Sequence, residues 1–376
     1  MSPAWLAHLT VVILIACAGC RTPGTEPPAL KLSATDAQAI DKVFTPYNTP
    51  GAAGAAVVVV SDGVVVFMRG YGAADIDNNI RVTERTNFRL ASLTKAFTAM
   101  AVMLLVNEGR LSLETPVASV VPEFPVYGRA ISVRHLLAHT SGLPPYRELL
   151  HGSPNAPLTD REVVKLLHGA DALLFPAGSA FRYGDTGYAV LAVVVELVSG
   201  SSFATFLRDR IFRPSGMTST VAWQPGDAMV TERARGYVAT PNGFRVDDDN
   251  PTSTVLGDGG VYSSVHDLVM WNRALDEHTL VGRQLQNLMW SPGALSDGTR
   301  THYGFGWFVD GRSPAGRVVS HRGDTTGFSH YMLKYLDRGI MIAVLTNRRG
   351  SPAADIAARI AALPSVQSRI MSARSS

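Results

Sequence analysis

A serine and a lysine stand three residues apart in the segment Ser92-Leu93-Thr94-Lys95. The run over residues 92–108 predicts a helix closed by Gly109, and residues three apart share a face of a helix. Ser92 would then lie at the helix start, where unpaired backbone N–H groups favour developing negative charge. A neutral lysine can take the proton of a serine hydroxyl when burial lowers the lysine pKa from about 10.4. The spacing therefore predicts a nucleophilic serine activated by an amine.

A tyrosine and a histidine lie in two later segments that could complete such a site. Tyr183 and Asp185 belong to a glycine-rich turn before an apolar helix predicted over residues 188–197, and loops on a rigid scaffold often carry functional residues. A plainer interpretation is that Tyr183 packs and Asp185 caps the helix. His321 begins a segment, 321–328, that follows a predicted strand, where glycine would let a ligand approach the backbone closely. The plainer interpretation of His321 is a histidine at a strand end with no partner.

The elements that must position these residues form an antiparallel sheet and a helical part. Apolar β-branched runs at 55–60 and 64–68 flank Asp62-Gly63, which predicts a tight hairpin, and both strands are apolar enough to be covered on both faces. We expect an α+β fold, an antiparallel sheet built from both chain ends and flanked by helices, with a mainly helical insertion. The other predicted strands are 304–309, 317–320, 329–335 and 340–346, with turns at 310–311 and 337–339, and the other predicted helices are 33–44, 133–138, 161–167, 203–211 and 352–363.

These elements imply one folded domain between an N-terminal leader and a short tail. The predicted regions are a signal peptide (1–20), a Pro-rich linker (21–37), a domain (38–362) with an α/β part at about 38–95 and 255–362 and a mainly helical part at about 96–254, and a tail (363–376).

The first apolar segment is typical of an export signal. Residues 4–20 contain no Lys, Arg, Asp or Glu and end in small residues before Arg21. The segment also resembles a bacterial lipoprotein signal in which Cys20 is acylated, with Cys17 as a second acceptable position. The alternative is an uncleaved membrane anchor. We expect a periplasmic or cell-envelope protein that is attached to the membrane through this end.

Composition excludes several classes of protein. Of the 376 residues, 46% are hydrophobic and 17% are charged, which rules out a disordered chain and allows a sizeable core. A net charge of +3 with no long basic run argues against nucleic-acid binding. Both cysteines lie in the first segment, which excludes a disulfide scaffold in the folded body. The lysines are few: Lys31, Lys42, Lys95, Lys165 and Lys334.

His135 and His139 have the i, i+4 spacing of a zinc site. However, Leu136 stands where a metalloprotease would have glutamate, and the spacing of His266 and Asp267 does not require a metal. We therefore expect no catalytic metal, and interpret His135 and His139 as satisfied polar groups that support the loop after them.

The three segments described first resemble the serine β-lactamase and penicillin-binding protein superfamily, whose members include class C β-lactamases, D-peptidases and related esterases. The Ser-x-x-Lys element is present at 92–95. The turn at 183–185 stands where the family places Tyr-x-Asn, and 321–323 stands where it places Lys-Thr-Gly or His-x-Gly. The resemblance spans about residues 38–362, and further family-like segments in the family's order are 134–143, 259–264 and 303–307.

The resemblance implies a role for each matching position. Ser92 would form an acyl-enzyme, Lys95 would act as base or proton relay, and Tyr183 would protonate the leaving group. Backbone N–H groups of Ser92 and Asp324 would form an oxyanion hole, with Gly323 in the same segment. No metal or organic cofactor is implied, and the substrate would be a small molecule or peptide.

Two positions depart from the family's pattern. Asp185 replaces the commonest Asn and can only accept hydrogen bonds. It would either pair with Lys95 and hold it charged, or share a proton network with Tyr183. His321 replaces lysine, and a neutral imidazole supplies less fixed positive charge for a substrate carboxylate, unless Arg322 points inward to supply it. Both changes favour a peptidase, amidase or esterase over an efficient β-lactamase.

The sequence thus predicts an exported serine hydrolase that cleaves an ester or amide through an acyl-enzyme, with D-amino-acid peptides, short esters or β-lactam-like molecules as candidate substrates. The alternative is a non-catalytic relative that binds cell-wall peptides or a protein partner in the same cleft, a reading motivated by the two departures. Retention of Ser92, Lys95 and Tyr183 argues against it, because a binding cleft needs no activated hydroxyl.

Overall fold

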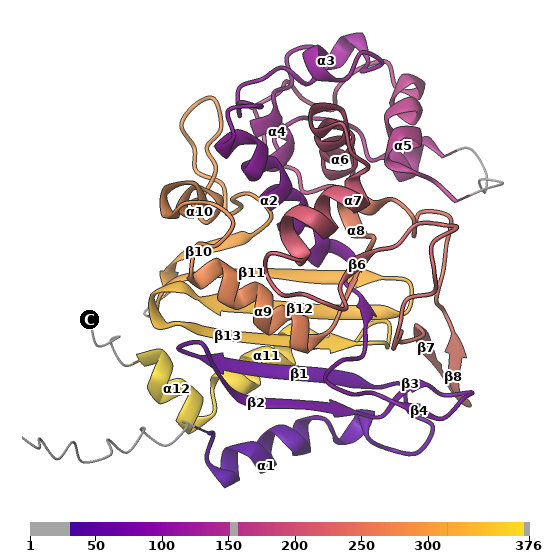
Figure 1. Cartoon of the computed structure of the whole chain (residues 1–376), viewed down its shortest axis with the longest axis vertical. Coiled ribbons are helices and arrows are strands. Elements are labelled where there is room, and N and C mark those ends of the chain that lie inside the picture. The colour runs from indigo at the N-terminus through magenta and orange to yellow at the C-terminus, as the bar shows by residue number, and fades with distance from the viewer. Residues whose placement is uncertain (1–30, 151–156, 314, 372–376) are drawn as a thin grey trace, which may run out of the picture. The chain divides into compact units, whose positions relative to one another are not determined.

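Strands from the two ends of the chain meet in one six-stranded antiparallel sheet (Figure 1). The computed structural model describes residues 31–150, 157–313 and 315–371. The strand order is β10-β11-β12-β13-β1-β2, so the first hairpin extends a meander formed by later strands. The predicted α+β architecture is confirmed. The strands are β1 (Ala55–Ser61), β2 (Val64–Tyr71), β10 (Phe308–Ser313), β11 (Gly316–Thr325), β12 (Phe328–Tyr335) and β13 (Ile340–Thr346).

The hairpin between β1 and β2 forms as the sequence predicts. Asp62 and Gly63 are the two turn residues, with φ of 49° and 77°. Positive φ at both positions matches the twist of the flanking strands, and glycine adopts it without a Cβ clash. Every residue of β1 is buried, whereas β2 is an edge strand with exposed positions. The prediction that both faces are covered is therefore correct for β1 and only partly correct for β2.

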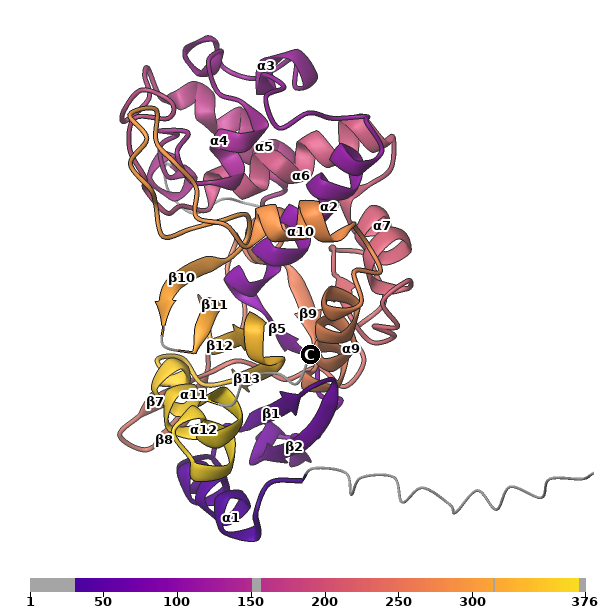
Figure 2. The same cartoon turned by 90° about the vertical axis from the view of Figure 1, so that its left-hand side faces the viewer.

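Helices pack on both faces of the sheet because strand side chains alternate between them. Val58 belongs to the core on the side of α2 (Thr94–Asn107) and α9 (Val265–Asp276), and Val57 to the core beneath α1 (Ala34–Val43) and α11 (Ala353–Ala361). Figure 2 shows α9 and α11 on opposite sides of the sheet. The predicted tail contains a further helix, α12 (Pro364–Met371), which buries Val366 and Ile370 against the second core.

The middle of the chain is mainly helical, as expected. The predicted helix at 203–211 divides into α7 (Phe203–Leu207) and a π-helical turn (Arg208–Phe212). Three small sheets of short strands were not predicted, because strands of two to four residues carry little periodicity. The other helices are α3 (Val117–Val120), α4 (Val133–Leu137), α5 (Asp160–Leu166), α6 (Thr186–Ser199), α8 (Leu256–Gly259) and α10 (Arg283–Met289), and the short strands are β3 (Ala73–Asp75), β4 (Ile80–Arg81), β5 (Phe88–Arg89), β6 (Val221–Ala222), β7 (Tyr237–Thr240), β8 (Gly243–Val246) and β9 (Val261–Ser263).

Three predicted strand boundaries near the C-terminal end are wrong. The strand expected from residue 304 begins at Phe308, because residues 303–307 form a tight loop in which the Gly304 N–H donates to the Trp307 carbonyl. The expected turn at 310–311 lies inside β10. Strand β11 continues through His321 to Thr325, so this histidine lies within a strand instead of after one.

The predicted signal peptide (1–20), Cys17, Cys20 and most of the predicted linker lie outside the described residues. Among the residues that are described, no single helix has the length and hydropathy needed to cross a membrane. Helix α6 and the helical segment 203–212 meet those requirements only as a pair bent by 79°.

Candidate active site

Ser92 lies in a tight turn between strand β5 and helix α2. The turn is a single 3₁₀ turn, Ala91–Leu93, and Ala91 has a φ of 49°, a left-handed conformation that non-glycine residues rarely adopt. The turn rests on β11 at Gly323, where a Cβ would lie 2.3 Å from the Leu90 carbonyl oxygen. Glycine is therefore required at 323 by the approach of the turn that carries Ser92. The left-handed backbone of Ala91 is strain of the kind that often marks a functional position.

Lys95 is completely buried and contacts Ser92 directly. Its Nζ donates to Ser92 Oγ at 2.9 Å, to Asp185 Oδ1 at 2.8 Å and to the Asp258 carbonyl oxygen at 3.1 Å. Burial by itself would lower the pKa of Lys95, but the Asp185 carboxylate outweighs it, so the pKa is raised. Burial opposes ionisation of Asp185 too, yet the Lys95 ammonium holds its pKa below the usual range. Of the two possibilities that the sequence left open for Asp185, the structure shows the pairing with Lys95.

Tyr183 lies on the other side of the serine hydroxyl. It is adjacent to Ser92 and Lys95, whose side chains both lower the pKa of its hydroxyl, and Lys95 Nζ lies 5.1 Å from its ring centroid. Burial disfavours the phenolate and raises the pKa of Tyr183, although the Lys95 ammonium works in the opposite direction. Tyr183 is therefore a neutral phenol beside Ser92, able to pass a proton on as it receives one.

Asp185 occupies the N-cap position of α6, but its side chain makes no capping hydrogen bond. The carboxylate instead contacts Lys95 through Oδ1 and Arg147 through Oδ2, at 3.4 Å. The plainer interpretation of Asp185 as a helix cap is therefore not what the side chain does.

Strand β11 turns His321 toward the site and Arg322 away from it. His321 is buried; its Nδ1–H donates to the Arg322 carbonyl at 2.7 Å, and the Tyr303 hydroxyl donates to Nε2 at 3.0 Å. Burial, together with the Lys95 ammonium, lowers the pKa of His321 to about 3, so the ring is neutral. The side chains of Arg322 and Asp324 are exposed and line a small cavity beside α11, because strand residues alternate between faces. The expectation that Arg322 could point inward is wrong, and only the backbone of Asp324 stays a candidate for the site.

The family follows from comparison with known proteins. The model of the family described as Beta-lactamase matches residues 40–365. This chain belongs to the Beta-lactamase family. It is thus a serine hydrolase of that family by descent, with Ser92, Lys95 and Tyr183 brought together by its fold.

Named relatives of this Beta-lactamase-family chain include peptidases and penicillin-binding proteins. It is similar to penicillin-binding protein 4* of Bacillus subtilis (31% identical over 306 residues, 78% of this chain and 67% of the relative). It is also similar to the D-aminopeptidase of Gluconobacter oxydans (30% identical over 308 residues, 80% of this chain and 57% of the relative). The aligned regions thus span between 57% and 67% of these two curated relatives. Among solved structures, the octameric penicillin-binding protein homologue from Pyrococcus abyssi superposes with a TM-score of 0.73 at 27% identity, over 88% of this chain and 76% of that one.

Two residues of this Beta-lactamase-family site were not found from the sequence. Asp258 is buried behind Lys95, and its carboxyl accepts a hydrogen bond from Tyr146 at 3.1 Å and lies 3.8 Å from Arg147. Burial, and then the nearby Asp185 carboxylate, raise the pKa of Asp258 to about 7. The one sequence feature that could have identified Asp258 is its position directly before the Gly259-Gly260 motif. Arg147 could not be identified from the sequence, because its carboxylate partners Asp185 and Asp258 are 38 or more residues away.

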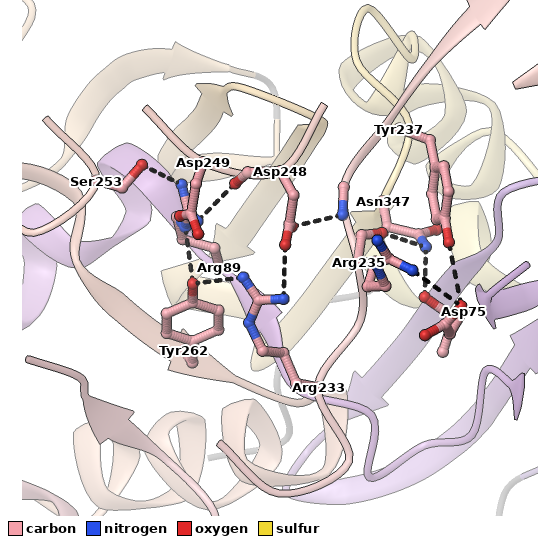
Figure 3. Close-up of polar contacts among 12 residues, drawn as sticks. Asp75, Arg89, Arg233, Arg235, Tyr237, Asp248, Asp249, Ser253, Tyr262 and Asn347 are labelled. Carbon is pink, nitrogen blue, oxygen red and sulfur yellow. Dashed lines mark hydrogen bonds and ion pairs between the residues drawn. The ribbon is translucent and has the colours of Figure 1, made fainter. Parts of the chain in front are cut away.

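A buried arginine network supports the strand that leads to Ser92 (Figure 3). Arg89 donates to the Tyr262 hydroxyl at 2.9 Å, to Ser253 Oγ at 2.6 Å and to the Asp248 carbonyl at 2.6 Å. Arg233 contacts the same Tyr262 hydroxyl and the Asp248 carboxylate. These bonds attach the loop around Asp248 to β5, three residues before the nucleophile.

The two histidines spaced like a zinc pair have separate surroundings. His135 completes a capping box with Ser132 at the start of α4. His139 is buried, and its Nε2 has no hydrogen-bond partner among the described residues, contrary to the expectation of a satisfied polar group. Within residues 31–150, 157–313 and 315–371, no cluster of three or more metal-ligating side chains is found.

Proposed function

We propose that this protein is an exported serine hydrolase that cleaves an ester or amide bond through an acyl-enzyme on Ser92. The observation that carries the proposal is the hydrogen bond from Lys95 Nζ to Ser92 Oγ, at 2.9 Å, with the Tyr183 side chain adjacent to both residues. Ser92 therefore has a buried ammonium as a charge partner and a partly buried phenol as a proton acceptor.

The geometry favours Tyr183 over Lys95 as the group that receives the serine proton. Lys95 is charged and donates to Oγ, so it has no lone pair to offer, and the Ser92 hydrogen is left for the Tyr183 oxygen. As Oγ bonds to the substrate carbonyl carbon, the Ser92 proton passes to Tyr183 and the Tyr183 proton passes to the leaving group, whose bond to carbon breaks. Water then attacks the acyl carbon and gives a proton to Tyr183, while the Tyr183 proton passes to Ser92 Oγ. The bond between Oγ and the acyl carbon breaks, and the acid is released. The Lys95 ammonium stabilises negative charge at Oγ, and the backbone N–H groups of Ser92 and Asp324 are the proposed oxyanion donors.

The substrate we propose is a peptide, amide or ester without a carboxylate next to β11. Both nitrogens of His321 are used by the protein, and the Arg322 side chain lies on the other face of the sheet. Strand β11 therefore offers no cationic side chain to a substrate carboxylate, the group that an efficient β-lactamase or carboxypeptidase would have to bind. The D-aminopeptidase relative supports an amide substrate.

The Lys95–Asp185 ion pair also supports a second candidate, a non-catalytic relative that binds peptides or a protein partner in the same cleft. A lysine that stays charged cannot act as a general base, and a binding protein would tolerate this. In the proposed enzyme, Tyr183 accepts the Ser92 proton, so a charged Lys95 does not prevent catalysis.

We also propose that the chain is exported to the periplasm or cell envelope and held at the membrane through its N-terminal region, by a lipid on Cys20 or by an uncleaved anchor. The support is the uncharged apolar stretch at residues 4–20, which ends in small residues.

The test is a hydrolysis screen with p-nitrophenyl acetate, a D-alanyl p-nitroanilide, D-alanyl-D-alanine peptides and a chromogenic cephalosporin, together with fluorophosphonate labelling. We expect turnover of the ester and the anilide that Ser92→Ala lowers by about 10³-fold or more. Ser291→Ala is the control, since Ser291 only donates to the Asn287 carbonyl at the end of α10. Equal ligand binding by wild type and Ser92→Ala, without turnover or labelling of either, would favour the binding protein.

A further inference from the structure

His139 brackets Tyr183 from both sides along the chain. Its carbonyl accepts a hydrogen bond from the Arg182 N–H at 2.9 Å, and its ring Nδ1 accepts one from the Gly184 N–H at 3.4 Å. The residues before and after Tyr183 are thus both hydrogen-bonded to His139, which lies just beyond the C-terminal end of α4. A residue held by both of its neighbours has little freedom to tilt its side chain.

The imidazole of His139 also packs against the Tyr183 ring. The two ring centroids are 4.4 Å apart, and the rings of Tyr303 and Tyr188 lie at 4.5 and 5.0 Å. Aromatic rings at this separation are in direct contact. His139 therefore contacts Tyr183 through its ring while it holds the backbone of the same residue.

His139 has two energetically unfavourable features, one in its backbone and one in its ring. Its φ is 57°, in the left-handed region, and its Nε2 has no partner among the described residues. Because a backbone N–H donates to Nδ1, the ring proton must be on Nε2, where it is a buried, unpartnered donor. Burial and the nearby Lys95 ammonium keep the pKa of His139 well below its usual value, so Nδ1 stays free to accept. Strain and an unpartnered ring nitrogen are also found at His278, so the contacts with Tyr183 are what distinguish His139.

We propose that His139 is a positioning residue for catalysis, which holds the Tyr183 hydroxyl against Ser92 through the Gly184 hydrogen bond and the ring contact. This inference rests on the proposed hydrolase function and adds to it the residue that orients the proton carrier. Because His139 is buried, its loss should change kcat and leave KM nearly unchanged.

The chain offers a matched control at His278. This residue also has a left-handed backbone, with a φ of 54°, and a buried ring nitrogen, Nδ1, without a partner among the described residues. It follows α9 and lines a separate cleft with Asp276 and Asp337. A phenylalanine at 139 or at 278 meets the same backbone strain, but only the one at 139 removes an acceptor next to Tyr183.

The test compares His139→Phe and His278→Phe by steady-state kinetics with p-nitrophenyl acetate, after thermal melts show that each variant is folded. We expect His139→Phe to lower kcat by about 10- to 100-fold with KM within about twofold, since small misplacements of catalytic groups have effects of this size. We expect His278→Phe to match wild type. Equal kcat for the two variants would overturn the proposal.

A conservative variant keeps the proposal falsifiable if His139→Phe does not fold. In His139→Asn, the amide Oδ1 occupies the place of Nδ1 as an acceptor for the Gly184 N–H, and Asn tolerates a left-handed backbone. We expect His139→Asn to retain most of the wild-type kcat. A folded His139→Asn as slow as Ser92→Ala would contradict the role in positioning, because the acceptor is still present.

A double-mutant cycle separates positioning of Tyr183 from general support of the fold. If His139 acts through Tyr183, His139→Phe should slow fluorophosphonate labelling of Ser92 in the wild-type background and have no further effect in a Tyr183→Phe background. Additive losses would overturn the proposal. A wild-type protein that is neither labelled nor active removes the proposed function and this inference together, whereas an active wild type with additive losses removes only the inference.

Discussion

Two lysines, Lys95 and Lys334, are almost completely buried, and each pairs with a partly exposed aspartate. Lys95 is 0% exposed and 2.8 Å from Asp185, and Lys334 is 1% exposed and 2.6 Å from Asp276. They differ in their remaining partners. Lys95 donates to the Ser92 hydroxyl, whereas Lys334 donates to the Asn272 amide oxygen at 2.6 Å.

The comparison shows that a buried ion pair does not by itself identify a catalytic lysine. Both pairs compensate the desolvation of a charged amine, which any buried lysine requires. Only Lys95 places its charge on an oxygen that can lose a proton, with a phenol beside it to receive that proton. The carboxamide of Asn272 has no such proton to give at neutral pH.

The largest expected difference between the two pairs is in activity. Lys95→Met should lower kcat/KM for p-nitrophenyl acetate by about 10³-fold or more, because Ser92 loses its charge partner. Lys334→Met should leave turnover within about twofold, since its contacts are structural. Each variant leaves a partly exposed carboxylate without its lysine, so both should lower the free energy of unfolding by about 1–3 kcal/mol. Activity loss of similar size in both variants would remove the distinction.

A smaller difference is expected from the carboxylates. Asp185 raises the pKa of Lys95, so Asp185→Asn should lower it and allow a neutral lysine to accept the Ser92 proton as pH rises. We expect the kcat/KM of Asp185→Asn to stay within about tenfold of wild type and to rise more steeply above neutral pH. Asp276→Asn is the control and should keep the wild-type pH profile. Identical profiles for all three proteins would show that Asp185 does not determine the charge of Lys95.

The last expected effect is on stability and not on activity, and it concerns Asp258, a second carboxyl next to the Lys95 pair. Its pKa of about 7 in the folded protein exceeds the ordinary aspartate value of 3.8, so folding takes up a proton between these values. The stability from this protonation is fully present below the unfolded pKa and is lost as pH rises through about 7. Between about pH 5 and about pH 8, wild type should lose about 2 kcal/mol of unfolding free energy relative to Asp258→Asn. Chemical denaturation at both pH values measures this, and a difference between the proteins that is constant with pH would contradict the shift.

Much of the fold could be predicted because its signals are local. Ser33 caps the first helix, Asp62 and Gly63 form the first turn, and Gly109, with a φ of 69°, follows α2. Strand β13 has the bounds expected from its apolar run. The start of β10 and the path of β11 through His321 could not be predicted, since they depend on packing against α2 and β12, which are distant in sequence.

The candidate site divides in the same way between local and distant information. The sequence by itself determined the family, the order of the motifs and the residues at 92, 95, 183 and 321, because residue type and spacing survive without coordinates. Only the tertiary structure decided that Asp185 pairs with Lys95 and raises its pKa, and that the Arg322 side chain points away from Ser92. It also decided that His139 forms hydrogen bonds to the residues on either side of Tyr183. These facts depend on contacts between side chains that are up to about ninety residues apart in sequence, and on the burial that determines the charges of those side chains.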